Sequence, residues 1–317
     1  MTNVQFLSIF KSYFEYLKEH FNPKTDLFAK FRFRHKQEIK QYVYFTPMAQ
    51  LILSDIRIYP IKSLGGIHLD KASVQGKGLA FDRRWMVIDK DGVAMTQRLY
   101  PEMALFKLRL QQQELSIEYT KNEKVISAVS FNVSTVETGK SIHAIIWNDK
   151  VDVLEVNPAV SQWFTHHLKT TCTLVAFPEK NPRPVDPQYR VNNEQVSLAD
   201  AYPFLLIGQS ALDDLNQRLA HPVPMNRFRP NFVFTGGTPY FEDQWKNFSI
   251  GKLRFMAVKK SARCILTTVN QETGEKGSEP LHTLSTYRKV DNKIFFGQNL
   301  LALDAGDVAV GDPIIVA

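Results

Sequence analysis

The sequence predicts a β-rich α+β protein with a few packing helices. Short apolar stretches separated by turn residues follow one another through the first half of the chain, and the second half mixes helical and extended patterns. Such a series of short strands is typical of a barrel or a sandwich and not of a doubly wound sheet. The 317 residues, 44% of them hydrophobic, suffice for two ordinary domains.

In the first half, the predicted strands are recognised from alternation and from flanking turns. Ile56 and Ile58 alternate with polar neighbours, which is the pattern of a half-buried strand. Residues 85–88 and 93–96 flank an Asp-Lys-Asp-Gly turn, so a hairpin is predicted there. Further strands are predicted at residues 106–110, 115–119, 125–133, 142–147 and 151–156.

The second half carries helix signals as well as strands. Asn157-Pro158 places a capping side chain before a proline at the first helical position, and a helix is predicted to follow. Ser210 is predicted to cap another helix. Four prolines between residues 178 and 196 predict an irregular connection beside a domain boundary. Strands are predicted at residues 232–235, 253–258, 294–296 and 308–316.

The first 47 residues differ from the rest in charge. They hold eight Lys and Arg against four acids, whereas the rest of the chain holds 31 against 28. The net charge of +7 therefore belongs largely to this segment, and nucleic-acid binding is not expected. Residues 4–21 predict an amphipathic helix. We favour a helix folded back on the body, or an extension upstream of a natural start at Met48, over a membrane-surface or partner helix.

Composition and missing motifs exclude several classes of protein. No apolar run approaches a membrane span and no secretory signal is recognised, so no transmembrane segment and a cytoplasmic location are expected. Two cysteines agree with a reducing compartment and exclude an iron–sulfur cluster held by this chain alone. The phosphate-binding loop, the dinucleotide fingerprint, the His-Glu-x-x-His helix and the Cys-x-x-Cys pair are absent. Nucleotide hydrolysis, dinucleotide-dependent hydride transfer and zinc hydrolysis therefore lose their usual support.

One cysteine is a candidate for chemistry. Cys264 follows Arg263 at the end of a predicted strand and precedes a threonine pair. A thiolate beside an arginine suits a soft metal. A free cysteine is also commonly a packed core residue, and on its own pattern Cys264 keeps that alternative. Cys172, between a predicted helix and a strand, is interpreted as a core thiol.

Basic and polar groups recur at the ends of predicted strands. In a barrel such positions face a common rim, and the planar guanidinium of arginine suits phosphate or carboxylate. The pattern predicts an anion-binding site. The groups are Lys62-Ser63, Asp82-Arg83-Arg84, Thr96-Gln97-Arg98 and Arg227-Phe228-Arg229-Pro230-Asn231.

These motifs together resemble those of a known family. The stretch 262–269, with Arg229-Pro230-Asn231, residues 58–63 and Gly311-Asp312-Pro313, is similar to the MOSC molybdenum-cofactor proteins. The most similar branch is that of the mitochondrial amidoxime-reducing component and its bacterial relatives. The resemblance runs from about residue 51 to 317. It implies two β-barrel-like domains, a MOSC N-terminal β-barrel domain over 48–177 and a MOSC domain over 178–317, after an extension over 1–47.

The resemblance also implies the cofactor and its residues. Molybdenum would be bound by a pterin dithiolene, by oxygen ligands and by Cys264, and Asp200 would lie near the metal as an acid/base group. Molybdenum-molybdopterin is expected, and pyridoxal phosphate is not. The positions that match the family's pterin- and phosphate-binding residues, together with the arginine beside the cysteine, are Lys62, Ser63, Arg83, Arg229, Asn231 and Arg263.

The chain departs from the family pattern at three positions. Ala201 and Tyr202 stand where animal members have hydroxyl residues, and Ala262 replaces a serine before Arg263. Contacts to the cofactor at these positions are expected from backbone groups or are lost. The chain ends at Ala317 without a ferredoxin domain, so electrons are expected from a separate flavin or iron–sulfur protein.

The function implied by the resemblance is the reduction of N-hydroxylated small molecules such as hydroxylamino purines and amidoximes, in a detoxifying role. An alternative is a carrier of the cofactor or of sulfur that uses Cys264 without its own turnover. A thiol hydrolase pairing Cys264 with a histidine such as His282 is a further alternative without a supporting motif.

Overall fold

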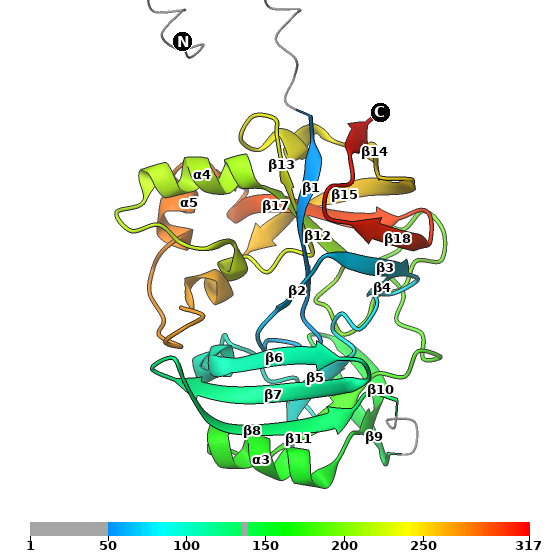
Figure 1. The fold of residues 1–317 in the computed structure, drawn as a ribbon, viewed down its shortest axis with the longest axis vertical. Helices are drawn as coiled ribbons and strands as arrows, with labels where there is room; N and C mark the ends of the chain where they lie inside the picture. Colours follow the sequence, from blue (N-terminus) through cyan, green and yellow to red (C-terminus); the bar gives the residue numbers. More distant parts are fainter. Residues whose placement is uncertain (1–49, 135–138) are drawn as a thin grey trace, which may run out of the picture. The chain divides into compact units, whose positions relative to one another are not determined.

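The computed structural model describes residues 50–134 and 139–317, and Gln50–Ala317 forms one compact unit (Figure 1). The predicted extension over 1–47 and its helix lie outside the described residues. The described part is rich in strands and has few helices, which confirms the predicted fold class.

One large sheet contains most strands of the second half of the chain together with β1 and β2, the first two strands of the described residues. Its strands pair antiparallel except for β12 and β13, which run parallel. In order across the sheet they are β19 (Ile314–Val316), β14 (Asn247–Ile250), β15 (Leu253–Arg263), β17 (Lys293–Ala302), β12 (Phe204–Gly208), β13 (Phe232–Thr235), β1 (Ile52–Ile58) and β2 (Ile67–Leu69), with β16 (Lys289–Val290) paired to β17.

The two ends of this sheet approach each other. Ile52 in β1 forms an isolated bridge with Pro313, just before β19. The Ile314 N–H donates to the Leu51 carbonyl at 2.8 Å. The sheet therefore curves round on itself in a barrel-like form, although none of the sheets in residues 50–134 and 139–317 is closed by continuous strand ladders.

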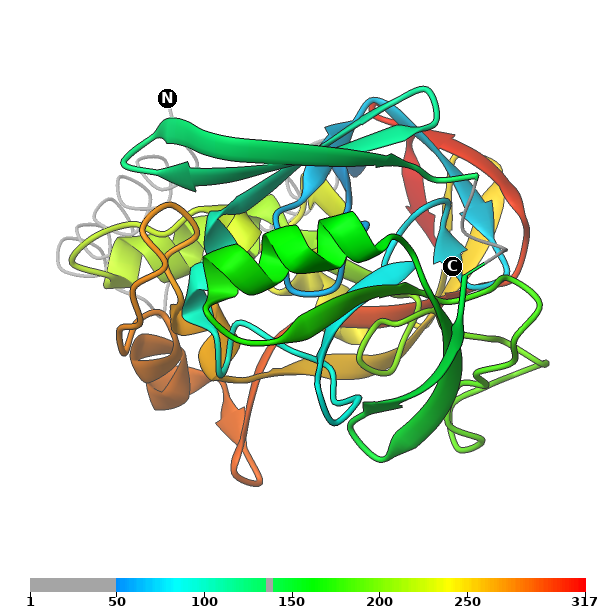
Figure 2. The same cartoon turned by 90° about the horizontal axis from the view of Figure 1, so that it is seen from below.

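The described residues also form three smaller sheets. The sheets that contain β5 and β6 lie at one end of the compact unit, at the bottom of Figure 1. Figure 2, seen from below, shows the helix α3 (Pro158–Leu168) beside this end, where it contacts β8 and β11. The sheets are β5 (Trp85–Asp89), β11 (Cys172–Ala176), β10 (Asp149–Glu155) and β9 (Ser141–Ile146); β6 (Phe106–Gln111), β7 (Glu114–Lys121) and β8 (Lys124–Asn132); and β18 (Gly306–Ala309), β3 (Lys71–Gln75) and β4 (Gly78–Leu79).

The helices test the capping predictions. The Asn157 side chain accepts from the Ala159 N–H at 2.8 Å, so α3 begins as predicted. The cap predicted at Ser210 is wrong, because α4 (Gln209–Arg218) is preceded by Gly208 and Ser210 lies inside it. A carboxylate far away in sequence, that of Glu242, accepts the Gly208 N–H at 3.1 Å instead. The remaining α-helix of the described residues, α5 (Leu281–Tyr287), lies near α4.

Two strand predictions need correction. Residues 93–96 form only isolated bridges to β9 and β5 and no second hairpin strand. The predicted strand over 308–316 is divided into β18 and β19, because a turn with Gly311 at φ +97° separates them. The observed β15 and β17 extend beyond the predicted 253–258 and 294–296.

Strand pairing connects the two halves of the sequence. β1 and β2 belong to the same sheet as β12 to β17 and β19, and β3 pairs with β18. Side chains from both halves, including Ile56, Val74, Phe232 and Phe255, share one core. The division into domains at 177/178 stays a prediction, and the segments on its two sides fold as one unit.

Candidate functional site

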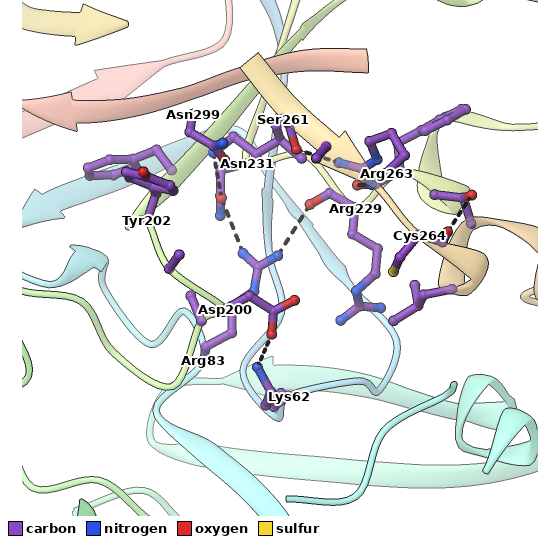
Figure 3. A pocket seen from close by; sticks show the side chains of 18 of the residues that line it. Lys62, Arg83, Asp200, Tyr202, Arg229, Asn231, Ser261, Arg263, Cys264 and Asn299 are labelled. Carbon is purple, nitrogen blue, oxygen red and sulfur yellow. Dashed lines mark hydrogen bonds and ion pairs between the residues drawn. The ribbon is translucent and has the colours of Figure 1, made fainter. Parts of the chain in front are cut away.

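A cavity of about 320 Å³ lies where loops of the first half meet the large sheet (Figure 3). Its wall is built from the turns after β1 and before β5, the segment before β12, the residues before β13 and the end of β15. All eight predicted site residues line it. They are Lys62, Ser63, Arg83, Asp200, Arg229, Asn231, Arg263 and Cys264.

Cys264 lies directly after β15 and is exposed. The Thr267 N–H and hydroxyl both donate to its carbonyl, at 3.1 and 3.0 Å, and fix the following 3₁₀ turn. Two irregularities in the β15–β17 pairing precede it. On the other edge of β17, Gly297, at φ +84°, allows the close approach of β12, since a Cβ there would lie 2.6 Å from Ile207 Cγ1. The backbone of Cys264 is thus held while its sulfur faces the cavity.

The charged group that contacts this sulfur is Arg98. The sequence places Arg98 among the strand-end groups but does not predict it as a site residue. Its Nη1 lies 4.0 Å from Cys264 Sγ and 3.9 Å from Asp200 Oδ2. Its guanidinium carbon lies 4.1 Å from the centre of the Trp147 ring. Arg98 therefore joins the thiol, the carboxylate and an aromatic side chain.

Arg263, the neighbour of Cys264 in sequence, directs its guanidinium elsewhere. Its Nη1 donates to Ser261 Oγ at 2.9 Å and its Nη2 to the Phe228 carbonyl at 2.6 Å. Its Nε is buried without a hydrogen-bond partner among the described residues, and burial lowers the pKa of this guanidinium. Arg263 thus keeps one buried donor without a partner beside the site.

Asp200 is held by two donors on one oxygen. Its Oδ1 accepts from Lys62 Nζ at 2.5 Å and from Trp147 Nε1 at 3.2 Å. Burial acts to raise the pKa of the Asp200 carboxyl, but the Lys62 ammonium and Arg98 outweigh it and hold this pKa well below its ordinary value. The carboxyl is therefore ionised at neutral pH.

A buried arginine holds the backbone that carries Asp200. Arg183, which is 4% exposed, donates to the carbonyls of Ser197 and Ala199 at 2.5 and 2.6 Å. Its Nε donates to Asp149, the first residue of β10, at 2.9 Å. Because Asp149 follows the turn that carries Trp147, Arg183 fixes both partners of the Trp147–Asp200 hydrogen bond.

Two further arginines pack against one tyrosine ring. The guanidinium carbons of Arg83 and Arg229 lie 4.3 and 4.2 Å from the centre of Tyr59. Arg83 also donates to both oxygens of Asp82 and to Asn231 Oδ1. Burial lowers the pKa of Arg229 to about 10, so it stays charged at neutral pH, and no described carboxylate forms an ion pair with it. An anion in the cavity would supply the missing partner.

The backbone is strained at three of the site residues. Ser63, Arg83 and Arg229 have φ of +65°, +50° and +57°, in the left-handed region that side chains with a Cβ seldom adopt. Such strain collects at ligand-binding sites and is held by the surrounding fold. Three strained residues around one cavity indicate a built binding site.

Some of the other residues singled out in the sequence line the cavity, and others do not. The departures Ala201, Tyr202 and Ala262 all line the cavity. Arg84 and Arg227 do not, and Arg227 instead donates to the Thr267 carbonyl at 2.9 Å and so supports the turn after Cys264. His282 lies on α5 and is not among the lining residues, so the hydrolase alternative gains no support.

Two kinds of feature are absent from the described residues. These residues contain no cluster of three or more His, Cys, Asp or Glu side chains arranged for a metal ion. Every described helix is too short or too polar to cross a bilayer.

The chain is similar to known proteins over most of its length. Models of the MOSC N-terminal beta barrel domain and of the MOSC domain match residues 50–171 and 193–315. Mitochondrial amidoxime-reducing component 1 of Homo sapiens is 30% identical over 279 residues, which cover 83% of this chain and 82% of the relative. The Mus musculus protein of that name is 32% identical over 281 residues, covering 83% and 81%. Molybdenum cofactor sulfurase of Arabidopsis thaliana is 33% identical over 269 residues, 77% of this chain but 32% of the relative. The chain belongs to the family of MOSC-domain proteins that includes the mitochondrial amidoxime-reducing components.

Proposed function

We propose that this protein is a molybdenum-cofactor-dependent oxidoreductase that reduces N-hydroxylated small molecules. The reaction takes R–NHOH, two electrons and two protons to R–NH₂ and water. The observation that carries the proposal is the exposed Cys264 thiol at the wall of a cavity ringed by buried cations. Relatives named for amidoxime reduction share most of the chain and support it.

The side chains of the cavity fit the cofactor. Cys264 offers one soft ligand, and the buried Arg229 offers charge and hydrogen bonds to a phosphate-bearing pterin. When bound, the cofactor supplies two-electron chemistry and accepts an oxygen atom. The residues that would hold it are Lys62, Ser63, Arg83, Arg229, Asn231, Arg263 and Cys264.

Asp200 is proposed as the acid/base residue. Because its carboxyl is ionised, it would begin the reaction as a base and not as an acid. An ionised carboxylate acts first as an acceptor, so Asp200 would take a hydrogen bond from the substrate's N–H or O–H. The Lys62 ammonium, bonded to the same carboxylate, is the source from which a proton would be passed on. Both side chains keep their positions through contacts within this chain.

The two electrons are proposed to arrive from a separate flavin or iron–sulfur protein. The chain has only two cysteines, and they lie in different environments, one buried and one exposed. Nucleic acid is not part of the proposal. A cytoplasmic location also remains our prediction, since the amidoxime-reducing relatives are named as mitochondrial.

Elemental analysis tests the proposal directly. Protein purified from a host that makes the cofactor should contain about one molybdenum per chain. It should also convert 6-hydroxylaminopurine to adenine with a reduced viologen dye as the electron donor. Absence of molybdenum, or molybdenum without turnover, would refute the proposed function.

A cofactor or sulfur carrier is the second candidate. The similarity to a molybdenum cofactor sulfurase and the exposure of Cys264 favour it. A sulfur carrier should show one added sulfur atom on Cys264 by mass spectrometry of the intact protein, and no turnover of N-hydroxylated compounds. A reductase should show the reverse.

A further inference from the structure

Arg98 has donors that no residue in the described part of the chain uses. Its two polar side-chain contacts, to Cys264 Sγ and Asp200 Oδ2, are long, at 4.0 and 3.9 Å. Hydrogen bonds from N–H to oxygen measure about 2.7–3.2 Å, and a guanidinium has five N–H donors. Arg83 in the same cavity, by contrast, bonds both Asp82 oxygens at 2.8 and 2.6 Å. Arg98 is therefore held near the thiol without being saturated.

Trp147 sets the position of Arg98. The indole lies at the turn between β9 and β10, at φ +55°, and is 57% exposed. A large side chain in left-handed backbone is costly and persists where its position is needed. Its ring contacts the Arg98 guanidinium, and its Nε1 bonds Asp200. Trp147 thus ties the arginine and the carboxylate into one wall of the cavity.

Asp200 separates two cations with different surroundings. Oδ1 accepts from Lys62, whose side chain is 6% exposed, and Oδ2 faces Arg98, whose side chain is 20% exposed. Lys62 already donates to the Leu198 carbonyl at 2.9 Å as well. Of these two cations, Arg98 is the one with free donors on the open side, beside the thiol.

We infer that Arg98, positioned by Trp147, binds the oxygen of the substrate's N-hydroxyl group. This inference rests on the proposed function. A charged donor aimed at an oxygen in a partly closed cavity forms a strong hydrogen bond and selects ligands that carry that oxygen. Arg98 is thus a specificity-determining residue, and Trp147 is a positioning residue that acts through it.

The test compares two neutral planar ligands that differ by this oxygen, 6-hydroxylaminopurine and adenine. Their dissociation constants are measured by calorimetry on oxidised, cofactor-loaded protein without an electron donor, so that no turnover is needed. Arg98→Gln should weaken binding of 6-hydroxylaminopurine about 10-fold and leave adenine within about 2-fold. Trp147→Ala should remove part of the same selectivity, and Trp147→Phe should keep it because the ring face remains. Arg190→Gln, at an exposed arginine, is the matched control.

Three outcomes would overturn the inference. Equal weakening of both ligands in Arg98→Gln would indicate a general structural role. Lost molybdenum with unchanged selectivity would assign Arg98 to the cofactor. A wild-type protein that binds the two ligands equally would show that the oxygen is not recognised. Failure of the proposed function is separate, because it is judged from molybdenum content and turnover of the wild type, whereas the selectivity is an equilibrium measurement.

Discussion

The cavity and the protein interior each contain one cysteine, and the two thiols differ in every contact. Cys264 is exposed and lies beside Arg98. Cys172, in β11, is 4% exposed and packs against apolar side chains. Among the described residues, the one polar side-chain group near its sulfur is the Thr165 hydroxyl, at 3.7 Å. Burial raises the pKa of the Cys172 thiol. Access and nearby positive charge, not residue type, separate a candidate ligand from a core thiol.

The pKa values of two carboxyl groups show the same difference between the cavity and the interior. Asp200, in the cavity, has its pKa lowered because Lys62 and Arg98 outweigh desolvation. Glu242, fully buried beside the start of α4, has one oxygen bonded to the Gly208 N–H and the other without a partner among the described residues. Burial raises its pKa to about 7. The surroundings of Asp200 therefore stabilise an ionised carboxylate, whereas those of Glu242 favour the neutral acid.

The largest expected effect is that of Cys264→Ser. It should reduce both bound molybdenum and N-hydroxylamine reductase activity at least about 100-fold, since a hydroxyl is a poor ligand for a soft metal. Metal content by elemental analysis and initial rates with a viologen donor measure it. Cys172→Ser is the matched control and should keep both, with a loss of stability only.

Alkylation tests the same contrast without the cofactor. In cofactor-free protein, iodoacetamide should modify Cys264 and spare Cys172 until the protein unfolds. Peptide mass spectrometry locates the label. Equal labelling of the two cysteines would remove the distinction on which the cofactor assignment depends.

The next effect is on the segment that carries Asp200. Arg183→Met should lower the free energy of unfolding by about 4 kcal/mol, because it leaves the carbonyls of Ser197 and Ala199 buried without donors. Urea unfolding measures this loss. Arg190→Met, at an exposed arginine in the same connection, should change stability by less than about 0.5 kcal/mol. A stable Arg183→Met protein would show that the segment does not depend on this arginine.

What could be predicted from the sequence was mostly local. Asn157-Pro158 predicts the start of α3 because the cap and the first turn are neighbours in sequence. The start of α4 could not be predicted in this way, since the group that accepts the Gly208 N–H comes from Glu242, 34 positions along the chain. The split of residues 308–316 depends on a single glycine turn that alternation does not reveal.

The candidate site shows the same limit. Family motifs predicted eight lining residues, and all eight meet in one cavity. Arg98 carried a signal, its place at a strand end, but not its contact with Cys264. Trp147 and Arg183 carried none, because one acts from an exposed turn and the other through backbone carbonyls of a proline-rich connection. Such roles depend on tertiary contacts that no short motif encodes.

Glu242→Gln should change how stability depends on pH. The folded protein keeps the Glu242 proton up to a pKa of about 7, whereas the unfolded chain releases it near 4.5. The wild type therefore loses stability as pH rises through this interval, by at most about 3 kcal/mol from this group. The glutamine variant should lack that loss, so its stability relative to wild type should rise between pH 4 and pH 8.5 in urea unfolding. Glu123→Gln, at an exposed turn, controls for removal of one negative charge.

Asp200→Asn should change the free energy of unfolding least, and the pH dependence of this change should be opposite to that of Glu242→Gln. At pH 7 it should cost about 1 kcal/mol, a low value because the Asp200 side chain is 56% exposed and water screens its pair with Lys62. A carboxyl whose folded pKa lies below 3.8 adds stability above that pH and loses it on acidification. The cost of the substitution should therefore shrink between pH 5 and pH 3, where the Glu242 contribution has already ended. A cost that grew on acidification would mean that the cavity raises the pKa of Asp200, as the interior raises that of Glu242, and the contrast between the two regions would fail.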